Sequence, residues 1–245
     1  MTKHIPNFLT LLNVLSGCIA TVFAAYNQLE YAALFVFVGV LFDFLDGFAA
    51  RMLKAYSELG LQLDSLADMV TSGLVPGMIM FQLLRMATSE GWTEPHLVNF
   101  DGSLGSWLPF AGFILTMASA YRLAKFNIDT EQTDSFIGLP TPANALFVIA
   151  LPLILLNQNN EVLSAMIHNP WFLIGVVLVN SWLMNARIPL FSLKFKTWGF
   201  AGNEIRYIFL ALCLVGLLTM KFMAIPAIIV LYVLLSLVGN AMRKS

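Results

Sequence analysis

Long apolar runs, separated by short polar connections, occupy most of this chain. An α-helix needs about 20 mostly apolar residues to cross the hydrocarbon core of a bilayer. Backbone groups inside a bilayer must be hydrogen-bonded within the protein, which favours helices over open sheets. We therefore predict an all-α fold, a transmembrane helix bundle of about eight spans, with a six-span core as the alternative. The runs cover residues 8–26, 31–50, 64–85, 105–124, 141–157, 170–187, 204–220 and 222–241.

The composition supports a protein of the bilayer. Hydrophobic residues make up 59% of the chain and charged residues 11%, whereas a typical soluble domain has about 25% charged residues. The net charge of −1 argues against a nucleic-acid partner. We expect one integral membrane domain over residues 1–245, with the lipid bilayer as its surroundings.

The basic residues predict the orientation. Cytoplasmic connections of membrane proteins are enriched in Lys and Arg. If the N-terminus is cytoplasmic, eight spans place all but two of the 13 basic residues on the cytoplasmic side, the exceptions being Arg85 and Lys221. The two longer external connections, residues 86–107 and 157–170, contain no Lys or Arg. We expect a multi-pass protein with both termini in the cytoplasm.

Four aspartates lie beside two of these apolar runs. Asp43 and Asp46 are three residues apart, and Asp64 and Asp68 are four residues apart. On a helix, each spacing places both side chains on one face. The predicted topology brings both pairs to the same cytoplasmic interface, so that two neighbouring helices could direct four carboxylates at one point.

Four carboxylates at this depth require positive charge. A single charge at the centre of a membrane helix costs about 2.5–3.5 kcal/mol on insertion scales. Oxygen ligands suit Mg²⁺ or Mn²⁺, and two such cations side by side promote displacement at phosphorus. We predict a cytoplasm-facing site for two divalent cations. Two alternatives are that Asp64 caps the third helix and that the acids bind the cation of an ion-coupled transporter.

Small and polar residues accompany the acids. Gly47, Ala50 and Gly60 remove side-chain bulk beside them, as a bound ligand would need, and Arg51 could contact a phosphate group. Close helix packing is another reason for such small residues.

Two further polar groups lie near the same interface. Asn7, Thr10 and Asn13 form a stripe on the first helix, which either holds a nucleotide or diphosphate or reflects the polarity of the interface. Arg122 and Lys125 either attract an anionic substrate group or anchor the helix at the membrane surface.

The spacing of the acidic segment resembles the signature of the CDP-alcohol phosphatidyltransferase family, D-x2-D-G-x2-A-R-x8-G-x3-D-x3-D. Every specified position of that pattern is present. The matching residues are Asp43, Asp46, Gly47, Ala50, Arg51, Gly60, Asp64 and Asp68.

The resemblance implies an enzyme that transfers a phosphatidyl group from a CDP-linked lipid to an alcohol and releases CMP. It implies that the four aspartates hold two metal ions and that Asp68 is also the general base. It further implies that Gly47, Arg51 and Ser57 bind the CDP-lipid, and that Ala50 and Gly60 shape the nucleotide pocket.

Three flanking segments resemble the serine-using members of this family: Ile5–Gly17, Tyr121–Asn127 with Phe136–Ala145, and Leu183–Lys196. This implies CDP-diacylglycerol and L-serine as substrates, a homodimer, and a place in the inner membrane of a bacterial cell. Choline, inositol phosphate and glycerol phosphate remain the alternative acceptors.

Overall fold

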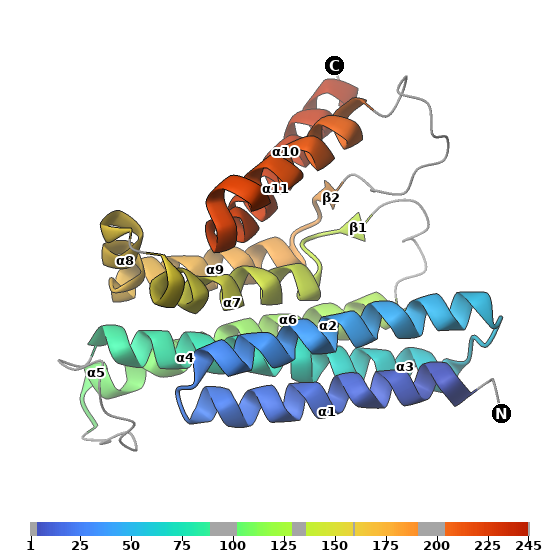
Figure 1. The fold of residues 1–245 in the computed structure, drawn as a ribbon, viewed down its shortest axis with the longest axis horizontal. Coiled ribbons are helices and arrows are strands. Elements are labelled where there is room, and N and C mark those ends of the chain that lie inside the picture. The colour runs from blue at the N-terminus through green and yellow to red at the C-terminus, as the bar shows by residue number, and fades with distance from the viewer. Residues whose placement is uncertain (1–3, 89–101, 129–135, 159, 191–203, 245) are drawn as a thin grey trace.

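The computed structural model describes residues 4–88, 102–128, 136–158, 160–190 and 204–244. These residues are mostly helical, as predicted (Figure 1). The α-helices are α1 (Ile5–Ala25), α2 (Leu29–Met52), α3 (Glu58–Asp68), α4 (Val75–Thr88), α5 (Leu104–Trp107), α6 (Ile114–Ile128), α7 (Thr141–Asn157), α8 (Glu161–Ile167), α9 (Pro170–Asn185), α10 (Glu204–Met220) and α11 (Ala224–Lys244).

Shorter elements connect several of these helices. A π-helical segment, η2 (Met69–Leu74), joins α3 to α4, and 3₁₀ turns η3 (Leu108–Phe113) and η4 (Lys221–Met223) precede α6 and α11. Two-residue strands β1 (Phe136–Ile137) and β2 (Pro189–Leu190) pair antiparallel.

Each predicted apolar run contains helix, and the run over residues 141–157 coincides with α7. The third run starts earlier than predicted. Ser57 accepts a hydrogen bond from the Gly60 amide and caps α3, which therefore begins at Glu58. The alternative that Asp64 caps this helix is wrong, because Asp64 lies inside α3.

Four stretches of the described residues are long and apolar enough to cross a membrane: Ile5–Ala25, Leu29–Met52, Glu58–Thr88 and Tyr207–Asn240. The pair α8–α9, bent by 75°, would be a fifth. The described residues thus include several membrane-capable helices, fewer by this measure than the eight spans predicted for the chain.

The first two helices pack side by side along their length (Figure 1). The chain turns between them at Asn27, which has a positive φ of 58°. Gln82 of α4 donates to the carbonyl oxygens of Ala24 and Ala25, at 2.9 and 3.0 Å. It thereby gives hydrogen-bond partners to carbonyl groups at the end of α1 that have none within the helix. This contact fixes α4 against the first helix at the end of the bundle opposite the aspartates.

The π-helical segment locks α3 and α4 against the first two helices. Thr71 donates a hydrogen bond to Asn13, 2.7 Å from its Oδ1 atom. The same side chain lies against two glycines, because a Cβ atom at Gly17 would overlap its Oγ1 and one at Gly39 would lie 2.6 Å from its Cγ2. Gly17 and Gly39 therefore allow α1, α2 and η2 to meet closely.

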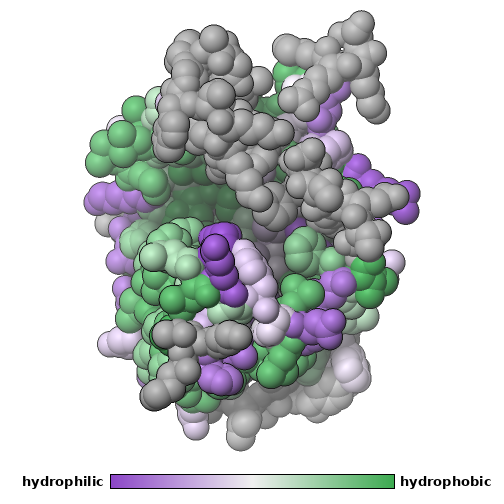
Figure 2. Space-filling model, turned by 90° about the vertical axis from the view of Figure 1, so that its right-hand side faces the viewer, coloured by the Kyte–Doolittle hydropathy of each residue, from purple (hydrophilic) through white to green (hydrophobic). Residues whose placement is uncertain are grey.

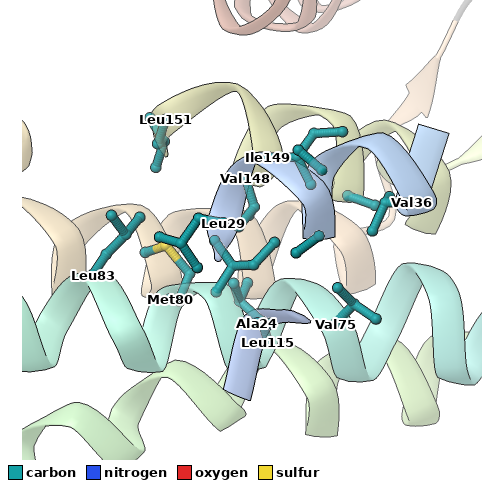
Figure 3. Close-up of a cluster of buried hydrophobic side chains, with 14 of the residues drawn as sticks. Ala24, Leu29, Val36, Val75, Met80, Leu83, Leu115, Val148, Ile149 and Leu151 are labelled. Atoms are coloured by element: carbon teal, nitrogen blue, oxygen red, sulfur yellow. The ribbon is translucent and has the colours of Figure 1, made fainter. Parts of the chain in front are cut away.

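A hydrophobic core fills the middle of the bundle (Figure 3). It draws side chains from helices that are distant in sequence, including Val36 of α2, Met80 of α4, Leu115 of α6 and Val148 of α7. Burial of such apolar surface stabilises the arrangement by about 25 cal/mol per Å². The core thereby holds α2, which carries Asp43 and Asp46, together with α4, α6 and α7.

The start of α7 is fastened to the end of α9. The backbone amide of Leu139 donates to the Leu183 oxygen at 2.9 Å, and that of Gly138 donates to Ile188. Gly138 has a φ of 73°, and a Cβ atom there would lie 2.5 Å from the Met184 oxygen. Only glycine fits this close backbone approach.

Candidate active site

The aspartate pairs of α2 and α3 face each other. Asp43, Asp46 and Asp64 each offer a carboxylate oxygen, and these three atoms lie within 4.8 Å of one another. Asp46 is buried, whereas Asp43 and Asp64 are half-buried. The helices bring together residues up to 21 positions apart, as the spacing predicted.

Asp68 lies one turn further along α3 and is 9% exposed. It is not one of the three carboxylates grouped above, but it interacts electrostatically with each of them. The fourth acid therefore borders the three-carboxylate group from a more enclosed position.

Thr10 of α1 supports the group directly. Its hydroxyl donates a 2.6 Å hydrogen bond to Oδ2 of Asp46, and its side chain is 3% exposed. This bond leaves the other oxygen of Asp46 available and fixes the direction of the carboxylate. The predicted polar stripe thus reaches the site at Thr10.

Asn7 lies one turn before Thr10 and faces the start of α3. A Cβ atom at Gly60 would lie 3.2 Å from its Oδ1 atom and 3.0 Å from the hydroxyl oxygen of Ser57. Gly60 therefore lets the first turn of α3 approach α1. Ser57 itself is exposed and caps this helix.

Asn13 is placed differently from the other two members of the stripe. It is fully buried and accepts the hydrogen bond from Thr71, while its Nδ2 atom has no partner in the part of the chain that the structure describes. Its observed contacts hold α1 against η2.

The surface beside Gly47 is open. A Cβ atom at this glycine would meet no other group within 4 Å. Arg51, one turn further along α2, is exposed, and Ala50 beside it is half-buried. Figure 2 looks onto the end of the molecule where α2 and α3 meet, and hydrophilic residues gather there among hydrophobic ones. Space for a ligand therefore lies next to the carboxylates.

Helix α6 is tied to α3 beside the acids. Ser65 donates to Oδ1 of Asn127 at 2.9 Å, and the amide group of Asn127 donates to Gln62 at 3.3 Å. These contacts set the distance between α3 and the helix that carries Arg122 and Lys125. Sequence reasoning missed them, because serine and asparagine at a helix surface are common.

Arg122 and Lys125 differ in their surroundings. The guanidinium of Arg122 interacts electrostatically with Asp68, and its buried Nε atom has no hydrogen-bond partner among the described residues. Lys125 is half-buried, one turn further along α6. Of these two predicted residues, Arg122 is thus the one that the structure brings to an aspartate.

One residue beside the acids escaped the sequence analysis. Thr141, the first residue of α7, faces the carboxylate of Asp68, although its hydroxyl does not reach the geometry of a hydrogen bond. Its position after Pro140, at the start of a helix on the predicted cytoplasmic side, was the available signal.

This donor set fits a divalent metal. Carboxylate oxygens are the ligands that Mg²⁺ and Mn²⁺ prefer. Three of them converge from two helices, and Thr10 orients one of the three. An acidic group of this kind could hold a metal ion, with the open space beside Gly47 left for a substrate.

A known family covers most of the chain. The family described as CDP-alcohol phosphatidyltransferase matches residues 3–191, which include the converging aspartates. The chain belongs to the CDP-alcohol phosphatidyltransferase family. The eight signature positions of this phosphatidyltransferase all lie in α2, in α3 or between them.

Several curated proteins are similar to this phosphatidyltransferase. A CDP-diacylglycerol–serine O-phosphatidyltransferase of Bacillus subtilis is 32% identical over 153 residues, 61% of this chain and 75% of that protein. One of Helicobacter pylori strain J99 is 29% identical over 86% of this chain and 81% of its own length. One of Mycobacterium leprae is 29% identical over 76% of this chain, which covers 57% of that longer protein.

Proposed function

We propose that this phosphatidyltransferase transfers the phosphatidyl group of CDP-diacylglycerol to the hydroxyl group of L-serine. The products are phosphatidylserine and CMP. The observation that carries the reaction class is the convergence of Asp43, Asp46 and Asp64 beside the open space at Gly47. The choice of serine is supported by the names of the similar proteins from three bacteria.

In this proposal the four aspartates hold two divalent cations, Mg²⁺ or Mn²⁺. Cations held by these carboxylates would supply positive charge to the oxygens of the substrate diphosphate and to the leaving CMP. Thr10 keeps the Asp46 carboxylate in position. Arg51, Ser57, Ala50 and Gly60 contact the CDP part of the lipid, and Asn7 lies close enough to Gly60 to contribute.

The serine hydroxyl oxygen attacks the β-phosphorus of CDP-diacylglycerol. The bond from that phosphorus to the oxygen of CMP breaks, and CMP departs with the electron pair. Asp68 accepts the hydroxyl proton. Its enclosed position on α3, against Thr141 and Arg122, suits a base that acts on a small acceptor.

We also propose a topology and an orientation for the enzyme in the membrane. The chain crosses the inner membrane eight times, both termini and the acidic site face the cytoplasm, and two copies form a homodimer. The acyl chains then stay in the bilayer while serine and CMP exchange with the cytoplasm. The charge asymmetry of the connections supports this orientation.

An acceptor panel on the purified protein tests the function. We expect CMP release from CDP-diacylglycerol to require both L-serine and a divalent cation. Choline, inositol phosphate and glycerol phosphate should support little release, and activity with one of them instead of serine would contradict the acceptor assignment. A transporter that binds cations at the same acids would release no CMP.

The role of Asp68 is tested in the same assay. Asp68→Asn keeps the shape of the side chain and removes the base, so that turnover should be nearly abolished while the protein remains folded. The matched control is Asp101→Asn, which changes an acid of a predicted external connection. Substantial turnover by Asp68→Asn would contradict the assignment of this residue as the base.

A further inference from the structure

Two buried polar side chains at the start of α7 lack hydrogen-bond partners among the residues that the structure describes. Thr141 is 1% exposed and Asn144 is 0% exposed. Within the described part of the chain, the hydroxyl of Thr141 and both polar atoms of the Asn144 amide are without a partner. Buried polar groups are nearly always hydrogen-bonded, because an unpaired group loses its hydrogen bonds to water and gains none from the protein. Three residues apart, the two side chains share one face of the helix.

The same helix end has unused backbone donors. Amide groups in the first turn of a helix have no partner within that helix. In α7 these are the amide groups of Thr141 and Ala143, because Pro142 has no N–H and the Asn144 amide donates to the Pro140 oxygen at 3.0 Å. The residue before α7 is Pro140, which provides no side-chain cap. The positive end of the helix dipole adds to these amide groups, and such an end favours an anion. The start of α7 is therefore suited to a carboxylate or phosphate group.

The position of this helix end is fixed by backbone contacts. Leu139 donates a hydrogen bond to Leu183 in the last turn of α9, and Gly138 donates one to Ile188, three residues beyond that helix. Asn185 of α9 in turn donates to the Ala118 oxygen of α6 at 3.1 Å. The first turn of α7 is thus held by the two helices α9 and α6, and its donors do not depend on a bound substrate for their placement.

The helix end lies where the acceptor would react. Thr141 faces the carboxylate of Asp68, and Arg122 adds a cationic group on the α6 side of the same carboxylate. In serine, two carbon atoms separate the hydroxyl oxygen from the carboxylate carbon. A serine whose hydroxyl meets Asp68 must therefore place its carboxylate within a few ångströms of that base.

We propose that Thr141, Asn144 and the free amide groups of the first turn of α7 bind the carboxylate of the acceptor amino acid. The inference rests on the proposed transfer to serine and adds the residues that distinguish serine from an uncharged amino alcohol. Thr141 donates its hydroxyl to the carboxylate, the Asn144 amide donates from one turn deeper, and Arg122 balances the charge.

The test compares serine with serinol, which has a CH₂OH group in place of the carboxylate. We expect the wild-type enzyme to prefer serine strongly. Thr141→Val removes the hydroxyl with little change of shape, so that KM for serine should rise about tenfold or more, as expected for loss of a hydrogen bond to a charged group. The KM for serinol and the KM for CDP-diacylglycerol should rise much less, because neither substrate presents this carboxylate.

Thr141→Ser is the matched control, because it keeps the hydroxyl and should keep the preference for serine. Equal loss of serine and serinol activity in Thr141→Val would assign the residue a structural role and overturn the inference. So would a wild-type enzyme that uses both acceptors equally well, a result that needs no variant. Failure of the wild type to use serine at all would instead overturn the proposed function.

Discussion

The hydroxyl of Thr10 in α1 donates a 2.6 Å hydrogen bond to Oδ2 of Asp46 in α2. The bond connects a helix without acids to the carboxylate cluster. It means that the position of α1 affects the geometry of the proposed metal site.

Loss of this hydrogen bond should weaken metal binding. We expect Thr10→Val to raise the Mg²⁺ or Mn²⁺ concentration needed for half-maximal CMP release by about 10- to 100-fold, as for other groups that orient a metal ligand. Activity at saturating metal should largely recover. Thr10→Ser keeps the hydroxyl and should behave like the wild type.

Thr21→Val is a second control for this prediction. Thr21 lies on the same helix and bonds only to the Gly17 oxygen of its own helix. A similar metal requirement in Thr10→Val and Thr21→Val would show that the bond to Asp46 has no special role.

Removal of divalent cations should stop the reaction. We expect a chelator to abolish CMP release, and added Mg²⁺ or Mn²⁺ to restore it. Asp64→Asn removes one charge from the three-carboxylate group and should not be rescued by excess metal. Retention of full activity in the presence of chelator would contradict the metal site. Electron paramagnetic resonance of Mn²⁺ would show directly whether Asp64→Asn has lost the ability to bind the metal.

Because the space beside Gly47 is open, we expect a larger side chain there to hinder lipid binding. Gly47→Leu should fill that space and raise KM for CDP-diacylglycerol by about 5- to 150-fold, since steric overlap costs about 1–3 kcal/mol. The measurement is initial rate against lipid concentration in mixed micelles. KM for serine should change much less.

Gly175→Leu is the matched control. Gly175 of α9 is also a half-buried helical glycine beside which a Cβ atom would meet nothing within 4 Å. Leucine should be tolerated there without an effect on KM. If both variants behaved alike, the space at Gly47 would have no role in lipid binding.

Because Thr71 lies against two glycines, we expect larger residues at those positions to destabilise the protein. Gly39→Ala and Gly17→Ala should each lower the thermal unfolding temperature, because overpacking costs about 1–3 kcal/mol. Thr71→Ser removes the Cγ2 atom that would lie 2.6 Å from a Cβ atom at Gly39, but keeps the Oγ1 atom that faces Gly17. The serine change should therefore rescue Gly39→Ala more than Gly17→Ala.

Equal rescue of the two alanine variants would contradict the observed placement of the Thr71 side chain. Thr71→Val offers a further comparison, because it removes the hydrogen bonds to Asn13 and keeps the volume. We expect it to lower the unfolding temperature by itself.

The helices and the acidic cluster were predictable because each depends on local periodicity. The apolar run at 141–157 predicts α7 from end to end, and the three- and four-residue spacings place the aspartates on helix faces. The start of α3 was misplaced by six residues, because the polar first turn from Glu58 is helical through its cap at Ser57 and not through hydrophobicity.

Contacts between distant helices were not predictable. Nothing in the local sequence distinguishes Asn13, which bonds to Thr71, from Thr10, which bonds to Asp46, although both belong to one stripe. Thr10 lies beside α2, whereas Asn13, one turn further along α1, lies beside the π-helical segment. Thr141 was missed for the same reason, since its neighbour Asp68 is 73 positions away in the chain.

The unobstructed flank of α2 at Gly47 bears on how the lipid arrives. Phe44 and Phe48 on either side of this glycine are largely exposed, as residues that meet acyl chains would be. A donor lipid that diffuses laterally in its leaflet can reach the acids from the side and need not leave the bilayer. Its encounter rate would then depend on its mole fraction in the membrane, whereas that of the soluble acceptor depends on its volume concentration.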